Sequence, residues 1–244
     1  MKRTFERIIL RSPKLYQFIS RHRKHSNPDK YIFSQLVKRG DVVVDCGANI
    51  GSYTRFFRNL VGSEGFVHSF EPVPATFDEL SKNLKSTITN IKLNNKGLFN
   101  KQKNEIIYLP DQTSGHASLT NHLNLWNANT IEEISVSLTT LDDYFDDNFI
   151  QVLDFMKIDI EGAELFAIQG SEQCLRKHKP ILHIEINTRL LKNFDTDPGL
   201  IYSTLRQFGY ERFTYYDDFP TKTSSFQTLI QNDQDIDVTL IAKM

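Results

Sequence analysis

Residues 43–54 read V-V-D-C-G-A-N-I-G-S-Y-T. The apolar run at 41–45 predicts a strand that is buried on both faces. Gly47 and Gly51 then allow a tight turn, and a helical pattern with one apolar face begins at Ile50. A strand, a glycine turn and a helix in this order predict the first unit of an alternating α/β fold, with a ligand bound at the turn.

The alternation of strands and helices continues on both sides of this unit. We expect further strands at 66–70, 91–94, 105–109, 134–138, 153–158, 181–186, 210–216 and 237–242, and helices at 4–24, 29–39, 74–85, 163–169 and 199–208. The pattern predicts a Rossmann-like α/β fold whose mostly parallel sheet holds about seven strands, with helices on both faces. In such a sheet, ligands bind beyond the carboxyl ends of the strands.

The N-terminal segment differs in charge from the rest of the chain. Residues 1–30 carry nine Lys or Arg residues against Glu6 and Asp29, a net charge of +7, whereas the whole chain has a net charge of −1. We expect a basic helical extension over 1–40 and the main domain over 41–244. The extension is either a helix packed through its apolar face or a positive arm that contacts a membrane surface, nucleic acid or an acidic carrier.

The composition argues against several classes of protein. No run of about 18 apolar residues occurs, and the basic N-terminus lacks the apolar core and cleavage site of a secretory signal. Cys46 and Cys174 lack the spacing of metal ligands, so we expect reduced thiols in a cytoplasmic protein, peripheral to the membrane if the basic arm binds lipid. The acidic main domain argues against a nucleic-acid partner. The sequence leaves the oligomeric state open.

Asp45 indicates which ligand the glycine turn binds. A carboxylate there repels the pyrophosphate of a dinucleotide but attracts the ammonium and sulfonium groups of S-adenosylmethionine. Ser52 replaces the third glycine of the dinucleotide pattern. Glu71 ends the second predicted strand, where an acid can accept two ribose hydroxyls, and Pro72 keeps it extended. These residues favour S-adenosylmethionine over a nicotinamide dinucleotide.

A second group of ionisable residues lies where a later strand ends. Lys157, Asp159 and Glu161 alternate and therefore project to one side of a strand. Because such groups are costly to bury without partners, they form either an ion pair that caps the next helix or part of an active site. The next predicted strand places His183 and Glu185 on one face, and a histidine there is either a hydrogen-bonded core residue or a base.

Taken together, these residues resemble the FkbM family of S-adenosylmethionine-dependent methyltransferases. The resemblance runs from about residue 41 to 170, and more weakly to the C-terminus. Four segments carry it: V-V-D-C-G-A-N-I-G-S-Y-T at 43–54, F-E-P-V-P-A-T-F-D-E-L at 70–80, L-T-T-L-D-D-Y at 138–144 and M-K-I-D-I-E-G-A-E at 156–164. The family implies a seven-stranded Rossmann-like methyltransferase fold and O-methylation of hydroxyls on sugars, polyketides or other secondary metabolites.

The resemblance also implies roles for the residues that match the family's motifs. Cofactor contacts fall on Asp45, Gly47, Asn49, Gly51 and Glu71. The second acidic motif, beside the cofactor and the acceptor, falls on Lys157, Asp159 and Glu161. Residues 1–40 lie outside the resemblance and inherit no role.

The expected reaction is displacement at the sulfonium methyl group by an acceptor oxygen, for which the protein aligns the acceptor and removes its proton. The candidate bases are His183 and Asp159, with Glu185 or Glu161 orienting the base or the hydroxyl. A divalent metal held by some of Asp159, Glu161 and Glu185 remains an alternative, although no metal is predicted.

The insertion between the strands expected at 105–109 and 134–138 indicates the class of acceptor. The polar insertion at 111–130 offers amides together with the flat rings of His116 and Trp126, which suit a sugar, although an ordinary exposed loop would have the same composition. We therefore expect a small-molecule or carbohydrate acceptor. A nicotinamide-dependent oxidoreductase of related fold and a non-catalytic adaptor that binds membrane or nucleic acid remain the alternatives.

Overall fold

The computed structural model describes residues 27–84, 89–110, 119, 130–216, 224–232 and 236–244. The expected helix at 4–24, His116 and Trp126 lie outside these residues. In the described part of the chain, no helix is both long and apolar enough to cross a membrane.

A central sheet has the strand order β10-β9-β11-β8-β7-β1-β2-β3. Neighbouring strands from β8 to β3 pair in parallel, whereas β11, β9 and β10 pair antiparallel. The described strands of this sheet are β1 (Val42–Cys46), β2 (Phe66–Phe70), β3 (Ile91–Asn94), β7 (Phe155–Ile158), β8 (Ile181–Asn187), β9 (Arg212–Tyr216), β10 (Ser224–Ser225) and β11 (Asp237–Lys243).

The predicted Rossmann-like α/β fold is therefore confirmed. Apart from the two-residue β10, the described strands of this sheet are the seven that such a fold requires. The chain winds outward from β1 through β2 to β3 and then returns to β7 on the other side of β1. The strand order reverses between β1 and β7, and open α/β sheets bind their ligands at such a switch point.

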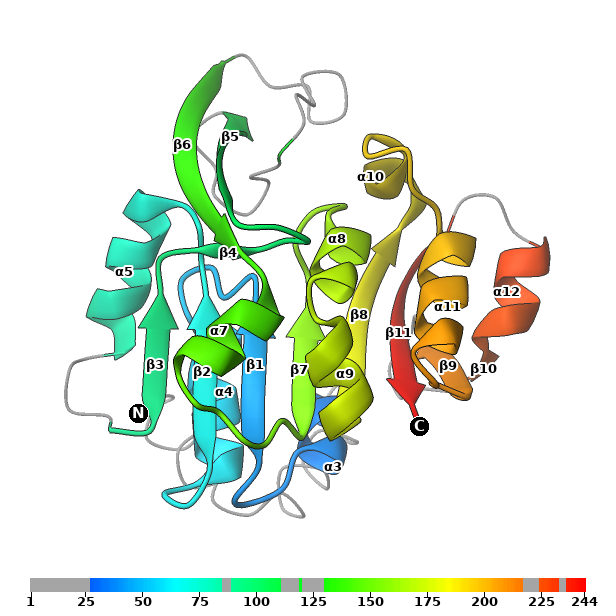
Figure 1. Cartoon of the computed structure of the whole chain (residues 1–244), viewed down its shortest axis with the longest axis horizontal. Coiled ribbons are helices and arrows are strands. Elements are labelled where there is room, and N and C mark those ends of the chain that lie inside the picture. The colour runs from blue at the N-terminus through cyan, green and yellow to red at the C-terminus, as the bar shows by residue number, and fades with distance from the viewer. Residues whose placement is uncertain (1–26, 85–88, 111–118, 120–129, 217–223, 233–235) are drawn as a thin grey trace.

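Helices cover both faces of the sheet, with α3 and α4 behind it and α7, α9 and α11 in front of it (Figure 1). The described helices are α3 (Pro28–Leu36), α4 (Ser52–Val61), α5 (Pro74–Leu84), α7 (Leu141–Asp147), α8 (Glu164–Gln169), α9 (Glu172–His178), α10 (Thr188–Lys192), α11 (Pro198–Gln207) and α12 (Phe226–Asn232). We did not expect α7, α9, α10 and α12. Each has only five to seven residues, too few turns for a helical period to stand out in the sequence.

The core lies on both faces of β1, as its apolar sequence predicts. Val44 packs in the cluster on one face and Val43 in the cluster on the other, and both are fully buried. Phe33 of α3 is also fully buried, in the same cluster as Phe155 of β7. The helix at 28–36 thus packs through its apolar face, while the proposed domain boundary at residue 40 stays a prediction.

A small second sheet, in the order β4-β6-β5, lies above the carboxyl ends of the central strands (Figure 1). The strands expected at 105–109 and 134–138 form its antiparallel pair, and β4 pairs in parallel with β6. Its strands are β4 (Gly97–Leu98), β5 (Lys103–Pro110) and β6 (Ile131–Thr139). This sheet stands over the edge where a ligand of the central sheet is expected.

Candidate functional site

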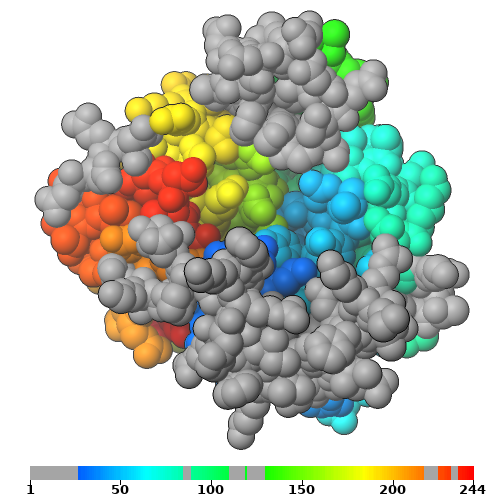
Figure 2. Space-filling view, turned by 180° about the vertical axis from the view of Figure 1, so that it is seen from behind, coloured from blue at the N-terminus to red at the C-terminus, as the bar shows by residue number. Residues whose placement is uncertain are grey.

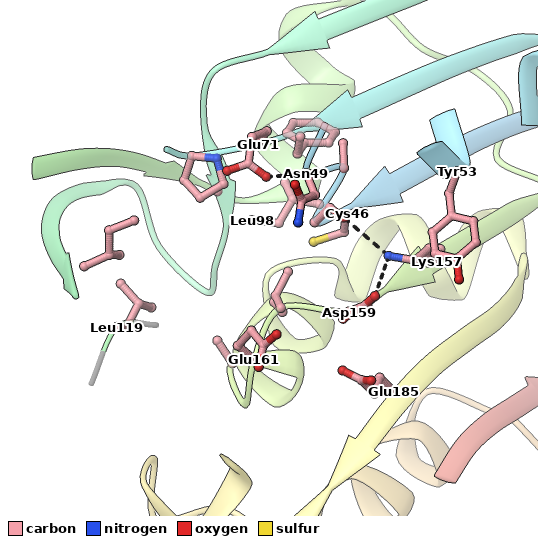
Figure 3. Close-up of a pocket in the computed structure, with 18 of the residues that line it drawn as sticks. Cys46, Asn49, Tyr53, Glu71, Leu98, Leu119, Lys157, Asp159, Glu161 and Glu185 are labelled. Atoms are coloured by element: carbon pink, nitrogen blue, oxygen red, sulfur yellow. Dashed lines mark hydrogen bonds and ion pairs between the residues drawn. The ribbon is translucent and has the colours of Figure 1, made fainter. Parts of the chain in front are cut away.

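A cavity of about 450 Å³ opens at the carboxyl ends of β1, β2, β7 and β8. Side chains from these ends and from the small sheet line it (Figure 3). Seen from behind, the blue surfaces of α3 and α4 adjoin the yellow-green end of β7 and the yellow β8 near the centre of the molecule (Figure 2). Because residues of both β1 and β7 line the cavity, it lies at the switch point of the sheet.

The glycine turn forms one side of this cavity. Gly47 has φ +82°, and a Cβ atom at this position would lie 1.9 Å from the carbonyl oxygen of Asp159. Only glycine allows this approach of the β1 turn to the end of β7. The turn is held from below, because the N–H groups of Gly47 and Ala48 both donate to the carbonyl of Phe70, at 3.2 and 3.0 Å.

Glu71 lies at the end of β2 and lines the same cavity. One carboxylate oxygen accepts the N–H of Asn49 at 2.9 Å and the other accepts the N–H of Val73 at 3.0 Å. Each oxygen keeps a lone pair for a further donor, such as a ribose hydroxyl. Burial raises the pKa of Glu71 to about 7, against the effect of these two N–H groups.

Asp45 lies beneath the turn and is fully buried. It is absent from the cavity lining, so it acts on a ligand only through its charge and through its neighbours. Its Oδ2 atom accepts the hydroxyl of Thr54 at 2.6 Å, and its Oδ1 atom lies 3.8 Å from Nζ of Lys157. Burial raises the pKa of Asp45, and Lys157 opposes this shift.

Lys157 supplies a buried ammonium group at the cavity wall. Its Nζ atom lies 2.9 Å from Oδ2 of Asp159 and 5.2 Å from the centre of the Tyr53 ring, and it donates to the Gly47 carbonyl at 3.4 Å. Burial by itself would lower the pKa of Lys157, but Asp159 and Asp45 hold it above its usual range. Lys157 is therefore charged and already paired.

Asp159 and Glu185 form a pair of carboxyl groups at the ends of β7 and β8. Burial and the adjacent Asp159 raise the pKa of Glu185, so Glu185 keeps its proton and donates a hydrogen bond to Asp159. Although burial opposes ionisation, Lys157 and Glu185 hold the pKa of Asp159 below its usual value. Asp159 is thus an ionised acceptor engaged by two partners.

Glu161 projects into the cavity from the loop after β7 (Figure 3). Its backbone is in the left-handed region, with φ +57°, a conformation that costs energy in a residue other than glycine. Glu164 stabilises this loop by accepting the N–H groups of Ile160 and Gly162, each at 3.1 Å. Burial, followed by Asp159 and Glu164, raises the pKa of Glu161 to about 8.

Aliphatic side chains also line the cavity, and we call them the apolar wall. Leu98 of β4, Ile107 of β5 and Leu138 of β6 contribute to this wall from the small sheet, and Leu119 of the polar insertion also lines the cavity. A cavity lined by both carboxyl groups and aliphatic side chains suits a ligand with a cationic end and a flat apolar end.

His183 is the candidate whose position differs most from the expectation. It is buried and does not line the cavity. Its Nε2 atom lies 2.6 Å from the hydroxyl of Tyr216, and Phe33 packs on its ring with centres 4.5 Å apart. It is therefore a hydrogen-bonded core histidine in this structure, one of the two alternatives that its place in the strand allowed.

The structure brings Gly47, Asn49, Glu71, Lys157, Asp159, Glu161 and Glu185 together around one cavity. Sequence reasoning missed Tyr53 and the apolar wall. Tyr53 lies in the quoted motif on the first turn of α4, so its spacing from Gly51 could have indicated it. The apolar wall had no comparable signal, because β4, β5 and β6 belong to a second sheet.

S-adenosyl-L-methionine fits the chemistry of these residues. Its ammonium and sulfonium groups would lie near carboxylates of the cavity, its ribose hydroxyls at Glu71 and its adenine against the apolar wall. A pyrophosphate would instead meet the carboxyl groups of Glu71, Asp159 and Glu161. Among the described residues, no group of three His, Cys, Asp or Glu side chains is arranged to hold a metal ion.

Comparisons with known proteins show the family of this chain. The family model described as Methyltransferase FkbM domain matches residues 45–212, more than half of the chain. A methyltransferase FkbM from Methylobacillus flagellatus has a similar structure, with a TM-score of 0.54 and 18% identity over 94% of this chain and 50% of that one. This chain therefore spans about half the length of that relative.

A second similar structure is a Clostridium thermocellum protein that carries the name rRNA-methylase, with a TM-score of 0.51 and 15% identity over 91% of this chain and 97% of that one. At these identities the likeness concerns the fold alone. Comparison with curated proteins gave no match.

Proposed function

This chain belongs to the methyltransferase FkbM domain family, and from this premise we propose that it methylates a hydroxyl oxygen of a sugar, a glycosylated metabolite or another secondary metabolite. The family makes it an S-adenosyl-L-methionine-dependent methyltransferase. That class replaces the nicotinamide-dependent oxidoreductase and the non-catalytic adaptor as interpretations of the sequence. The choice of oxygen and the class of acceptor are the parts proposed here.

The position of Glu161 carries the proposal for oxygen. When bound, S-adenosyl-L-methionine supplies a methyl group that is already activated by its sulfonium, so the protein has to align the acceptor and take up its proton. Glu161 lines the cavity, and its pKa of about 8 is close to neutral. A carboxylate with such a pKa is a more effective proton acceptor for a hydroxyl than an ordinary one.

Asp159 and Lys157 then have orienting roles. Asp159 was a candidate base, but its partners Lys157 and Glu185 lower its pKa. A lower pKa makes Asp159 a weaker proton acceptor. We assign it to fixing the ends of β7 and β8 and to attracting the cationic end of the donor. Glu185 carries a proton that engages Asp159, so we assign it to holding that carboxylate in place. His183 does not line the cavity, so we assign the role of base to Glu161 instead.

The sugar acceptor rests on the insertion at 111–130. Leu119 belongs to this insertion and lines the cavity, as do Ile107 and Leu138 of the strands on either side of it. Leu119, a residue of the insertion that the structure describes, thus lies at the proposed acceptor site. His116 and Trp126 remain the proposed rings that pack on the acceptor.

A comparison of acceptors tests this proposal. We would measure methyl transfer to glycosides, to simple alcohols and to amines with the wild type and with Trp126→Ala. Ring stacking predicts that transfer to glycosides exceeds transfer to the alcohols and falls in the variant, because the aromatic platform is removed. Transfer confined to amines would refute the choice of oxygen. Equal rates on glycosides and alcohols in both proteins would refute the sugar.

A further inference from the structure

A partly buried polar cluster adjoins the cavity through Tyr53 and joins four elements of the fold. We call it the Asp29 cluster, and it consists of Asp29, Tyr53, His183 and Tyr216. The hydroxyl of Tyr53 donates to one oxygen of Asp29 at 2.5 Å, and the hydroxyl of Tyr216 donates to the other at 2.7 Å. Nε2 of His183 lies 2.6 Å from the Tyr216 hydroxyl and 3.6 Å from Asp29.

Asp29 is ionised in this cluster. Burial opposes ionisation, but His183, Tyr53 and Tyr216 together hold the pKa of Asp29 well below its usual value. Hydrogen bonds to a charged acceptor are the strong class, so the two tyrosine hydroxyls are firmly held. The carboxylate therefore fixes two aromatic side chains that come from α4 and β9.

The two tyrosines differ in one respect that matters for function. Tyr53 lines the cavity, whereas Tyr216 does not. The Tyr53 ring also lies over the ammonium of Lys157, with 5.2 Å between Nζ and the ring centre, and Lys157 pairs with Asp159. A contact path thus runs from Asp29 through Tyr53 and Lys157 to the carboxylate at the cavity wall.

The segment around α3 supplies three of the contacts that hold Tyr53. Asn27 donates to its hydroxyl at 3.1 Å, Asp29 accepts from that hydroxyl, and Phe33 meets its ring edge-to-face with centres 5.3 Å apart. These residues precede the segment that matches the family, which begins at residue 45. The family match therefore assigns them no role.

We propose that Asp29 is a positioning residue of the methyltransferase, which holds the Tyr53 ring against Lys157 and so fixes the Lys157–Asp159 pair at the wall of the S-adenosyl-L-methionine cavity. Without the hydrogen bond to Asp29, only the weaker contacts with Asn27 and Phe33 hold the Tyr53 ring from this side, so its place over the ammonium of Lys157 is less firmly fixed. Helix α3 is then part of the binding machinery as well as of the core.

Two matched tyrosine variants test this role. Tyr53→Phe and Tyr216→Phe each remove one hydroxyl that donates to Asp29, but only Tyr53 lines the cavity. Calorimetry would give the Kd of S-adenosyl-L-methionine and of its demethylated product for the wild type, both variants and Asp29→Asn. Thermal unfolding without ligand would report the stability of each protein.

We expect Tyr53→Phe and Asp29→Asn each to raise the Kd of S-adenosyl-L-methionine by about 3- to 10-fold, the equivalent of one net hydrogen bond. Tyr216→Phe should lower the unfolding temperature but leave the Kd within about twofold, because Tyr216 does not line the cavity and Tyr53 keeps its own hydrogen bond to the other oxygen of Asp29. The double variant Asp29→Asn with Tyr53→Phe should bind no more weakly than Tyr53→Phe, because Asp29 acts through that hydroxyl.

Wild-type binding by Tyr53→Phe would overturn the proposal, as would equal losses of binding in the two tyrosine variants. Additive losses in the double variant would also overturn it, because Asp29 would then act by another route. If Asp29→Asn does not fold, the comparison of the two tyrosine variants decides. All these readouts concern the donor, so they stand whether or not the acceptor is a hydroxyl.

Discussion

The close approach of Gly47 to β7 predicts a large cost for a single added methyl group. In Gly47→Ala the new Cβ atom would lie 1.9 Å from the carbonyl oxygen of Asp159, so the β1 turn and the end of β7 must separate. A left-handed φ costs an alanine about 1–2 kcal/mol, and overpacking adds about 1–3 kcal/mol. We therefore expect the free energy of unfolding to fall by about 2–5 kcal/mol, measured by urea denaturation.

Gly40→Ala is the matched control. Gly40 has φ +87°, close to that of Gly47, but nothing lies within 4 Å of its Cβ position. It should lose only the backbone component, about 1–2 kcal/mol. Gly47→Ala should also weaken donor binding, because separation of the turn from β7 displaces Lys157 and Asp159, whereas Gly40→Ala should bind as the wild type does. Equal destabilisation by the two variants would refute the close-approach argument.

Three further predictions follow from the carboxyl groups. Glu71→Ala should weaken calorimetric binding of S-adenosyl-L-methionine by about 1–3 kcal/mol through the loss of hydrogen bonds to a charged acceptor, and unchanged affinity would contradict the ribose assignment. Glu161→Gln should lower turnover by about 10²–10⁴-fold and change donor affinity only a few fold; full turnover would exclude Glu161 as the proton acceptor. The ligand-free protein should lose stability as the pH rises from about 5 to about 8, because folding raises the pKa of Glu71 and Glu161 from 4.5 to about 7 and about 8, so the folded state keeps protons that the unfolded chain has released. Urea denaturation across this range should show a shallower pH dependence for Glu161→Gln, and an identical slope would contradict the raised pKa.

The strands were the most predictable part of the fold. The strand at 66–70 and the strand at 91–94 have the bounds expected from their apolar residues and flanking turns. The glycine turn and Glu71 could be placed at one edge because parallel strands bring their carboxyl ends together. The small sheet could be predicted only as two strands, because the pairing of β4 with β6 depends on contacts between distant segments.

The chemistry of the site was less predictable, and His183 shows why. Alternation along a strand fixes the face on which a side chain lies but not its depth beneath the end of the strand. His183 lies two residues, about 7 Å, further from the strand end than Glu185, which is enough to place it in the core instead of the cavity. The contact of Asp29 with Tyr216 joins residues 187 positions apart, which no local pattern could indicate.

Transfer of an isotope-labelled methyl group tests the central claim most directly. The protein would be incubated with S-adenosyl-L-methionine carrying a ¹³C-methyl group and an extract of its host, and the products examined by mass spectrometry and carbon NMR. We expect one labelled methyl group on an oxygen of a host compound, formed by the wild type and reduced to a trace by Glu161→Gln. Label found only on nitrogen or carbon, or label on oxygen in equal amounts with both proteins, would contradict the account.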